Sequence, residues 1–323
     1  MSSASIWPPG LSGVRRSGRR RNRHDGGPGL MGRVDCEMGF GSMSERLVRK
    51  LDLVEVEQLI GWAAAEGWNP GLDDAAAFHA TDPEGFIGAF VDGEMVAGIA
   101  AVAYGTSYGF IGLYISREDR RGRGHGKAVW NAGMAYLAGR TIGLDGVDEQ
   151  FENYRGKGFA PAYRTIRLGG AFAGPAVDQG MLTPVTPDLL PQLMPHLLAF
   201  DRRSFPEPRD AFLARWLRPP HLACVALPEG QITGYGVMRK CRAGWKIGGL
   251  SAVDEGTAAA LVRQLAASAE GEVFIDVPAA RERFMDLLVR SGLRPGFETT
   301  RMYLGEPIPL APELFGVTTL ELG

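Results

Sequence analysis

Three glycines alternate with basic or imidazole side chains in the run Arg121-Gly122-Arg123-Gly124-His125-Gly126. Glycine lets the backbone approach a ligand without a Cβ in the way, so successive backbone N–H groups in such a loop can converge on an anion. The side chains of Arg120, Arg121, Arg123 and Lys127 add positive charge, which attracts phosphate. The chemistry predicted here is therefore the binding of a phosphate or pyrophosphate group.

The segments on either side of the loop are those that an anion site needs. An apolar run from Phe110 to Ile115 predicts a buried strand before it. A helical pattern follows it, with one apolar face formed by Val129, Ala132, Gly133, Tyr136 and Leu137. This order places the ligand at a helix N-terminus, where the helix dipole favours negative charge. A Walker A loop is excluded because Ala128 replaces the required Ser/Thr, and a Rossmann fingerprint because Lys127 replaces the third glycine.

The pattern Arg-x-x-Gly-x-Gly after a strand resembles the acyl-CoA loop of the GNAT (Gcn5-related) N-acetyltransferases. A tyrosine five residues before the phenylalanine of a Gly-Phe pair also resembles that family, and here it is Tyr154 before Gly158-Phe159. The resemblance implies that acetyl-CoA is the co-substrate and that Tyr154 protonates the departing thiolate. The alternative is a tyrosine packed on a helix face. The acetyl-CoA-binding residues that the resemblance implies are Leu113, Tyr114, Ile115, Arg121, Gly122, Arg123, Gly124, His125, Gly126, Lys127 and Asn153.

The chemistry that the resemblance implies, direct attack of a neutral amine on the thioester, requires a base or a water path to deprotonate an ammonium. The strand from Phe110 to Ile115 has no acidic residue, although many relatives keep a Glu there. Asp145, at the end of the next predicted strand, is the candidate base; the alternative is a turn-forming Asp before Gly146. The sequence also departs from the family pattern in having Asp148 where an Asn is usual, six residues before Tyr154.

The order of predicted elements around the loop is also that of a GNAT fold, over about Arg46 to Gly169. The predicted strands are 47–51, 86–91, 95–104, 110–115, 141–144 and 163–167, and the predicted helices begin near residues 53, 73, 126 and 149. Asp52 and Glu55 have the spacing of a capping box, and Asp92-Gly93 predicts a hairpin turn. We therefore expect an α+β fold with a mixed, mostly antiparallel sheet flanked by helices.

A repeat with a constant offset of 134 residues indicates a second copy of this fold. Gly158, Pro161, Thr165 and Arg167 recur as Gly292, Pro295, Thr299 and Arg301. In the second copy, Asp254 and Glu255 stand where the phosphate loop should lie. These carboxylates would repel a pyrophosphate and instead fit a helix N-cap and first turn. Tyr154 corresponds to Leu288, which cannot donate a proton. The sequence predicts one acyl-CoA site per chain.

These patterns divide the chain into four segments. Residues 1–42 are expected to be a disordered Gly/Arg-rich extension, 43–170 a GNAT N-acetyltransferase domain, 171–180 a linker, and 181–323 a diverged GNAT-like domain. The basic cluster from Arg15 to Arg23 has the composition of a nucleic-acid or membrane-surface arm, and the favoured alternative is an extension without function. With a net charge of −2 and no long apolar run, the sequence predicts neither a nucleic-acid nor a membrane partner. Three scattered cysteines without metal-ligand spacing predict a reducing, cytoplasmic compartment and no metal.

Two functions are consistent with the sequence. The first is an acetyl-CoA-dependent N-acetyltransferase acting on a small amine, a peptide or a protein lysine, with the second domain walling the acceptor pocket. Mycothiol-synthase-like enzymes, which also have tandem GNAT folds, are a narrower case of it. The second is a non-catalytic acyl-CoA-binding sensor or scaffold. Either is compatible with a homodimer.

Overall fold

A computed structural model describes residues 46–174 and 181–323. The predicted extension 1–42 and most of the predicted linker lie outside the described residues. The first half of the chain, residues 46–170, contains β1 (Arg46–Lys50), α1 (Leu53–Ala65), α2 (Asp74–Thr81), β2 (Phe86–Val91), β3 (Glu94–Tyr104), β4 (Tyr108–Ser116), the short helix η1 (Glu118–Arg120), α3 (His125–Tyr136), β5 (Thr141–Gly146), α4 (Asp148–Arg155) and β6 (Ala160–Gly170).

The second half, residues 181–323, repeats this order. It contains β7 (Leu182–Pro184), α5 (Leu190–Asp201), α6 (Asp210–Trp216), β8 (Leu222–Ala226), η2 (Pro228–Gly230), β9 (Gly234–Lys240), β10 (Trp245–Ile247), β11 (Leu250–Ala252), α7 (Glu255–Ala266), β12 (Val273–Pro278), α8 (Glu282–Arg290), β13 (Arg294–Leu304) and β14 (Leu314–Gly316). The predicted α+β repeat is confirmed, and β14 is an element that the sequence patterns did not indicate.

Local signals account for the start of α1 and for the first hairpin. Asp52 accepts a hydrogen bond from the Glu55 backbone N–H at 2.9 Å, and the Glu55 carboxylate accepts one from the Asp52 N–H at 3.0 Å. This is the predicted capping box, which satisfies two N–H groups at the helix end. Asp92 and Gly93 both have positive φ, 52° and 80°, as a tight turn between twisted antiparallel strands requires. Both predictions are confirmed.

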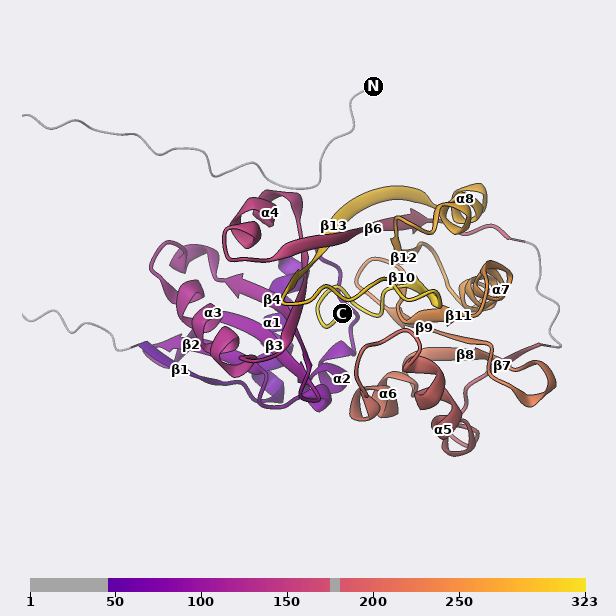
Figure 1. Ribbon diagram of the computed structural model, residues 1–323, viewed down its shortest axis with the longest axis horizontal. Helices are drawn as coiled ribbons and strands as arrows, with labels where there is room; N and C mark the ends of the chain where they lie inside the picture. Colours follow the sequence, from indigo (N-terminus) through magenta and orange to yellow (C-terminus); the bar gives the residue numbers. More distant parts are fainter. Residues whose placement is uncertain (1–45, 175–180) are drawn as a thin grey trace, which may run out of the picture. The chain divides into compact units, whose positions relative to one another are not determined.

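One sheet runs through both halves in the order β1-β2-β3-β4-β5-β13-β6-β12-β10-β9-β11-β14 (Figure 1). The last long strand of each half pairs with strands of the other half. β13 lies between β5 and β6, and β6 lies between β13 and β12. The two halves therefore exchange strands, and the edge of each half is completed by the other.

The exchange explains the 134-residue repeat. Thr165 pairs with its own repeat partner, Thr299, so a pseudo-twofold axis passes between β6 and β13 at this point. On one side of the axis Arg301 lies opposite Asp145, and on the other side Arg167 lies opposite Asp276. The repeated arginines thus form two equivalent ion pairs, each joining a strand of one half to a strand of the other.

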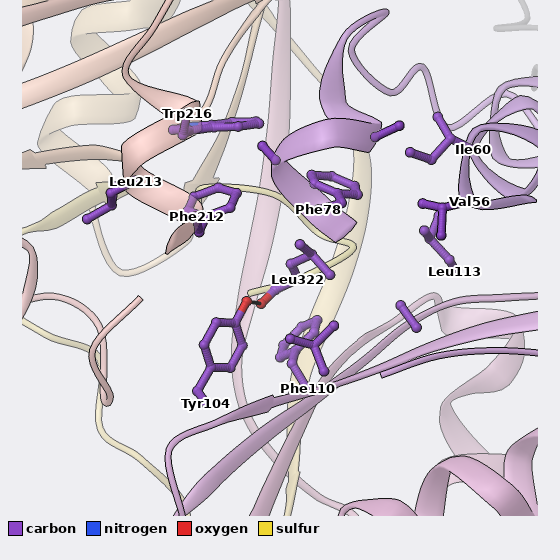
Figure 2. Packing of buried hydrophobic residues seen from close by; sticks show 14 of the residues in the cluster. Val56, Ile60, Phe78, Tyr104, Phe110, Leu113, Phe212, Leu213, Trp216 and Leu322 are labelled. Carbon is purple, nitrogen blue, oxygen red and sulfur yellow. Dashed lines mark hydrogen bonds between the residues drawn. The ribbon is translucent and has the colours of Figure 1, made fainter. Parts of the chain in front are cut away.

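A hydrophobic core shared by the two halves holds them together on one face of the sheet. It joins α1 and α2 of the first half to α5 and α6 of the second. Phe78 of α2 stacks on Trp216 of α6 with ring centroids 6.3 Å apart, and Leu322 lies in the same cluster with Phe110 (Figure 2). Each fully buried side chain of this size stabilises the fold by about 1.5–3 kcal/mol. The opposite face has separate cores under α3 and under α7 and α8.

Within the described ranges, 46–174 and 181–323, no helix is both long and apolar enough to cross a membrane. The same residues contain no group of three or more His, Cys, Asp or Glu side chains placed to hold a metal ion. Cys224 and Cys241 are buried free thiols, and burial raises the pKa of both. These two cysteines are therefore packing residues with little thiolate character.

Candidate active site

The glycine loop ends at the N-terminus of α3, as predicted. Gly122 and Gly124 have φ of 77° and 79°, in the left-handed region that favours glycine. Gly124 is the N-cap residue, and no side chain caps the helix. The Ala128 N–H donates to the Gly124 carbonyl, which leaves the preceding N–H groups of the first turn without an intrahelical acceptor. These groups are available to an anion at the helix end.

The basic side chains of the loop fall into two groups. Arg121 is held in place, since it donates to the Ser116 carbonyl at 3.1 Å and pairs with Glu66. Arg123 and Lys127 are exposed, and neither forms an ion pair with another described residue. Arg120, the fourth basic side chain of the predicted set, lies within ion-pair distance of Asp119 and Glu94. Two of the four side chains therefore pair within the protein, and Arg123 and Lys127 remain for a ligand.

His125 and Gly126 pack the loop against the end of β4. The His125 Nδ1 atom is buried and has no hydrogen-bond partner among the described residues. Burial lowers the pKa of His125, and the guanidinium groups of Arg46 and Arg123 lower it further. A Cβ on Gly126 would lie 2.8 Å from the Ser116 Oγ and 3.0 Å from the Tyr114 hydroxyl. The structure therefore brings the predicted loop and the predicted strand end together, in a positive potential that fits an acyl-CoA pyrophosphate.

Strands β4 and β5 diverge next to this loop. They are paired in parallel only from Tyr108 with Thr141 to Ile111 with Leu144. Beyond Ile111, β4 pairs with β3 alone, across a bulge in which Leu113 has a φ of 46°. Among the described strands, the end of β5 pairs only with β13. Among the described residues, the backbone of β4 that faces β5 thus has no sheet partner at Gly112 to Ile115, where an extended arm could bind.

Tyr154 lies on α4 beside the end of β5. A Cβ on Gly146 would be 3.1 Å from the Tyr154 ring. The ring stacks on Trp130 of α3, with centroids 5.8 Å apart, and meets the edge of Phe159. Burial raises the pKa of Tyr154 to about 12, with a further contribution from Tyr114. The hydroxyl is therefore protonated at neutral pH, as a proton donor must be, while the ring also serves as a packing element.

The other two candidate residues have partners of their own. Both carboxylate oxygens of Asp145 accept hydrogen bonds from Arg301, each at 2.8 Å, and the Asp145 side chain is fully buried. Asn153 lies on the exposed side of α4, where it donates to Gln150 and accepts from Lys157. The role of Asn153 in acetyl-CoA binding stays a prediction, and Asp145 has an ion-pair partner that the sequence did not indicate.

The second half lacks both features of this site. The Asp254 carboxylate accepts a hydrogen bond from the Thr257 N–H at 2.7 Å and caps α7, as predicted. Leu288, which corresponds to Tyr154, is fully buried. In addition, β14 pairs with β11, and the Val317 N–H donates to the Asp276 carbonyl at the end of β12. The chain's own strand therefore fills the place where, in the first half, β4 and β5 diverge.

Sequence reasoning missed Arg301 and Trp130 as parts of the first-half site. The repeat of Arg167 at Arg301 was a usable signal, because a charged residue recurring in an otherwise diverged copy needs a structural reason. Trp130, whose ring contacts both Tyr114 and Tyr154, gave no such signal. It belongs to the apolar face of α3 and is 7% exposed.

The fold agrees with comparisons to known proteins. Residues 53–150 match the acetyltransferase (GNAT) family, and residues 197–315 match a second acetyltransferase (GNAT) domain. Holothin acyltransferase from Pseudoalteromonas sp. (strain SANK 73390) is 31% identical over 267 residues, which is 81% of this chain and 89% of that protein. The chain belongs to the GNAT acyltransferase family, with two GNAT domains. Membership implies an acyl-CoA co-substrate and an amine acceptor.

Solved structures share the tandem arrangement. A putative acetyltransferase from Pyrococcus horikoshii superposes with a TM-score of 0.71 at 20% identity, covering 86% of this chain and 96% of that one. A tandem GNAT protein from the clavulanic acid biosynthesis pathway superposes with a TM-score of 0.56 at 14% identity, covering 82% of this chain and all of that one (100%). At these identities the likeness concerns the fold alone.

Proposed function

We propose that the protein transfers the acetyl group of acetyl-CoA to the primary amine of a small-molecule acceptor, by direct attack, at a single site in the first half. The observation that carries this proposal is the uncapped N-terminus of α3 beside the divergence of β4 and β5. One feature can hold a pyrophosphate and the other an extended pantetheine arm, and together they have the layout of an acyl-CoA site.

Each part of the site has a role in this reaction. Arg123, Lys127 and the first-turn N–H groups of α3 bind the pyrophosphate. The amine attacks the thioester carbon, backbone N–H groups at the bulge of β4 stabilise the oxyanion, and the C–S bond breaks. Tyr154 donates its proton to the departing thiolate. The hydroxyl is protonated at neutral pH, so the proton is present when the thiolate forms.

Before it can attack, the ammonium group of the acceptor must lose a proton, either to Asp145 or to water. For Asp145 to accept it, the carboxylate would become neutral beside a buried Arg301, and the guanidinium would lose its counter-charge. An uncompensated buried charge is costly. The geometry therefore supports a water path better than Asp145 as the base.

On the acceptor side, the second half supports the predicted wall. The backbone of Glu321 lies on Gly112 of β4 so closely that there is no room for a Cβ. A cavity of about 30 Å³ is lined by Tyr108 of β4 and by Phe205, Arg301 and Tyr303 of the second half. A cavity of this volume could accommodate about two water molecules. So narrow a space disfavours a peptide chain, and the relative named for holothin points to a small-molecule amine instead.

The test is a screen of primary amines, including holothin, with acetyl-CoA and longer acyl-CoA donors. Release of free CoA would be followed together with the mass of the acylated product, and the Gly124→Asp variant would serve as the control without a functional loop. We expect one class of small amine to gain 42 Da from acetyl-CoA in the wild type only. Tight acetyl-CoA binding with no acetylated amine would instead support the sensor function.

A further inference from the structure

The end of β5 is held in place by the second half of the chain. Asp145 and Gly146 lie beyond the last residue pair that joins β5 to β4, and their sheet partners are Arg301 and Thr300 of β13. The position of this strand end sets how far β5 stands from β4. Any acyl-CoA arm bound between the two strands depends on that distance.

The ion pair of Asp145 and Arg301 holds both side chains in a fixed orientation. Two parallel N–H···O bonds of 2.8 Å join the groups, and the guanidinium also lies over the ring of Phe110 on β4, 4.9 Å from its centroid. Burial alone would lower the pKa of Arg301, but the Asp145 carboxylate together with Tyr163 and Tyr303 raises that pKa overall, so the pair stays charged. A planar fork of this kind fixes orientation as well as distance.

We propose that Arg301 is a positioning residue for acyl-CoA binding: supplied by the second half, it holds the end of β5 through Asp145 and so maintains the divergence of β4 and β5. The inference rests on the proposed acyl-CoA site in the first half. It assigns the second half, which has no cofactor loop, a direct part in building that site. It also assigns Asp145 to anchoring Arg301, and the amine proton then leaves through water.

The chain contains its own control for this proposal. Arg167 and Asp276 form the pseudo-symmetric pair, with bonds of 2.7 and 2.9 Å. The side chains are also well buried, 12% and 3% exposed. There, however, the adjacent space is filled by β14. Arg167 also donates to the Trp68 carbonyl at 3.1 Å. Loss of the fork at Arg167 therefore has a comparable structural cost without reaching the acyl-CoA site.

The first experiment compares Arg301→Lys with Arg167→Lys. Lysine keeps the charge and loses the bidentate fork. By calorimetric titration of the full chain, we expect Arg301→Lys to weaken acetyl-CoA binding about tenfold, the effect of losing one charge-assisted hydrogen bond. Arg167→Lys should change the affinity for acetyl-CoA less than about twofold. The two variants should nevertheless lower the melting temperature by similar amounts. Equal affinities in the two variants, with wild-type binding intact, would overturn the inference. Absence of binding in the wild type would instead overturn the proposed function.

A second variant separates positioning from base catalysis and covers the case in which Arg301→Lys does not fold. The double change Asp145→Asn with Arg301→Gln replaces the ion pair by a neutral amide pair. If the pair only positions β5, kcat/KM should stay within about tenfold of the wild type, and the decrease should come from a higher KM for acetyl-CoA. The pH profile of kcat/KM should keep its shape. A loss of kcat of about 10²-fold or more, with the acidic limb abolished, would make Asp145 the base and refute the assignment.

Discussion

The helices α3 and α7 occupy the same place in the two halves and begin in opposite ways. Helix α7 begins at Asp254, whose carboxylate accepts a hydrogen bond from the first turn. Helix α3 begins at Gly124, in a left-handed conformation and with no capping side chain. A helix N-terminus needs acceptors for its free N–H groups. The second half supplies an acceptor from its own Asp254 side chain, and the first half leaves the N–H groups free to bind a ligand.

The strands beside these helices differ in the same way. In the second half β14 fills the space at the end of β11. In the first half the equivalent part of β4 has no partner on the side of β5 within residues 46–174 and 181–323. The comparison teaches that a repeated fold loses a binding site when the chain itself provides the cap and the strand that the ligand would have provided. The halves then remain equivalent in architecture but not in chemistry.

The largest expected effect is at the cap of α3. Gly124→Asp places a carboxylate at the phosphate site and a side chain at a positive φ, so acetyl-CoA binding should fall by at least about 100-fold. Gly124→Asn has nearly the same shape, tolerates the left-handed region and carries no charge, so it should lose clearly less. Calorimetric titration measures both, and the wild type should bind one acetyl-CoA per chain. Two equivalent sites, or equal losses in the two variants, would contradict this account.

The next effect concerns turnover rather than binding. Tyr154→Phe keeps the ring against Trp130 and removes only the hydroxyl, so acetyl-CoA binding should be unchanged while kcat falls about 10²-fold. Tyr136→Phe is the matched control, because its hydroxyl bonds to Asp82 on the outer side of the domain, and it should turn over like the wild type. If Tyr154→Phe retained full activity with chemistry rate-limiting, Tyr154 would be a packing residue only.

A smaller effect is expected at the cap of α7. Asp254→Ala removes the N-cap bond and should cost about 1 kcal/mol of unfolding free energy. Asp52→Ala, at the capping box of α1, should cost a similar amount. Because β14 still fills the second half, neither change should alter the stoichiometry of one acetyl-CoA per chain. Denaturant unfolding and titration measure the two quantities, and the appearance of a second site in Asp254→Ala would show that the cap alone excludes the ligand.

The smallest expected effect concerns Lys246, a buried lysine of the second half that contacts Trp68 of the first half. Lys246 donates to the Trp68 carbonyl at 3.3 Å, and burial, followed by Arg167, lowers the pKa of Lys246 to about 8. Below pH 8 the folded protein must keep a buried ammonium, so stability from this group rises with pH between about 8 and 10.5. Lys246→Met should raise the melting temperature by about 2–4 °C at pH 7.

The advantage of the methionine should shrink as the pH rises toward 10.5. Thermal scans at several pH values check this, with Lys240→Met, an exposed lysine, as the control. A lower melting temperature for Lys246→Met at pH 7 would mean that the hydrogen bond to Trp68 outweighs the desolvation of the ammonium.

Elements defined by local signals were predictable. The capping box at Asp52, the turn at Asp92-Gly93 and the cap at Asp254 involve residues one to three positions apart, and the structure confirms each of them. The glycine loop before α3 was predictable for the same reason, because its residues adjoin in sequence and its conformation needs glycine. The roles of its residues in acetyl-CoA binding, and that of Tyr154, stay predictions.

The contacts that unite the halves were not predictable in this way. Asp145 and Arg301 are separated by 156 residues, and Arg167 and Asp276 by 109. The repeat revealed that the arginines correspond, but not that each pairs with the opposite half. Strand exchange and the place of β14 depend on which edges remain unpaired once both halves have formed, and no local pattern records that.

By itself, then, the sequence determined the fold of each half, the presence of a loop suited to phosphate and the loss of that loop in the second copy. These depend on short-range spacing, side-chain type and backbone conformation. Only the tertiary structure decided that the halves share one sheet and that β13 anchors the end of β5. It also decided that β14 fills the place in the second half that corresponds to the divergence of β4 and β5. The physical reason is that edge pairing and buried ion pairs are settled by the whole set of competing partners in the folded chain.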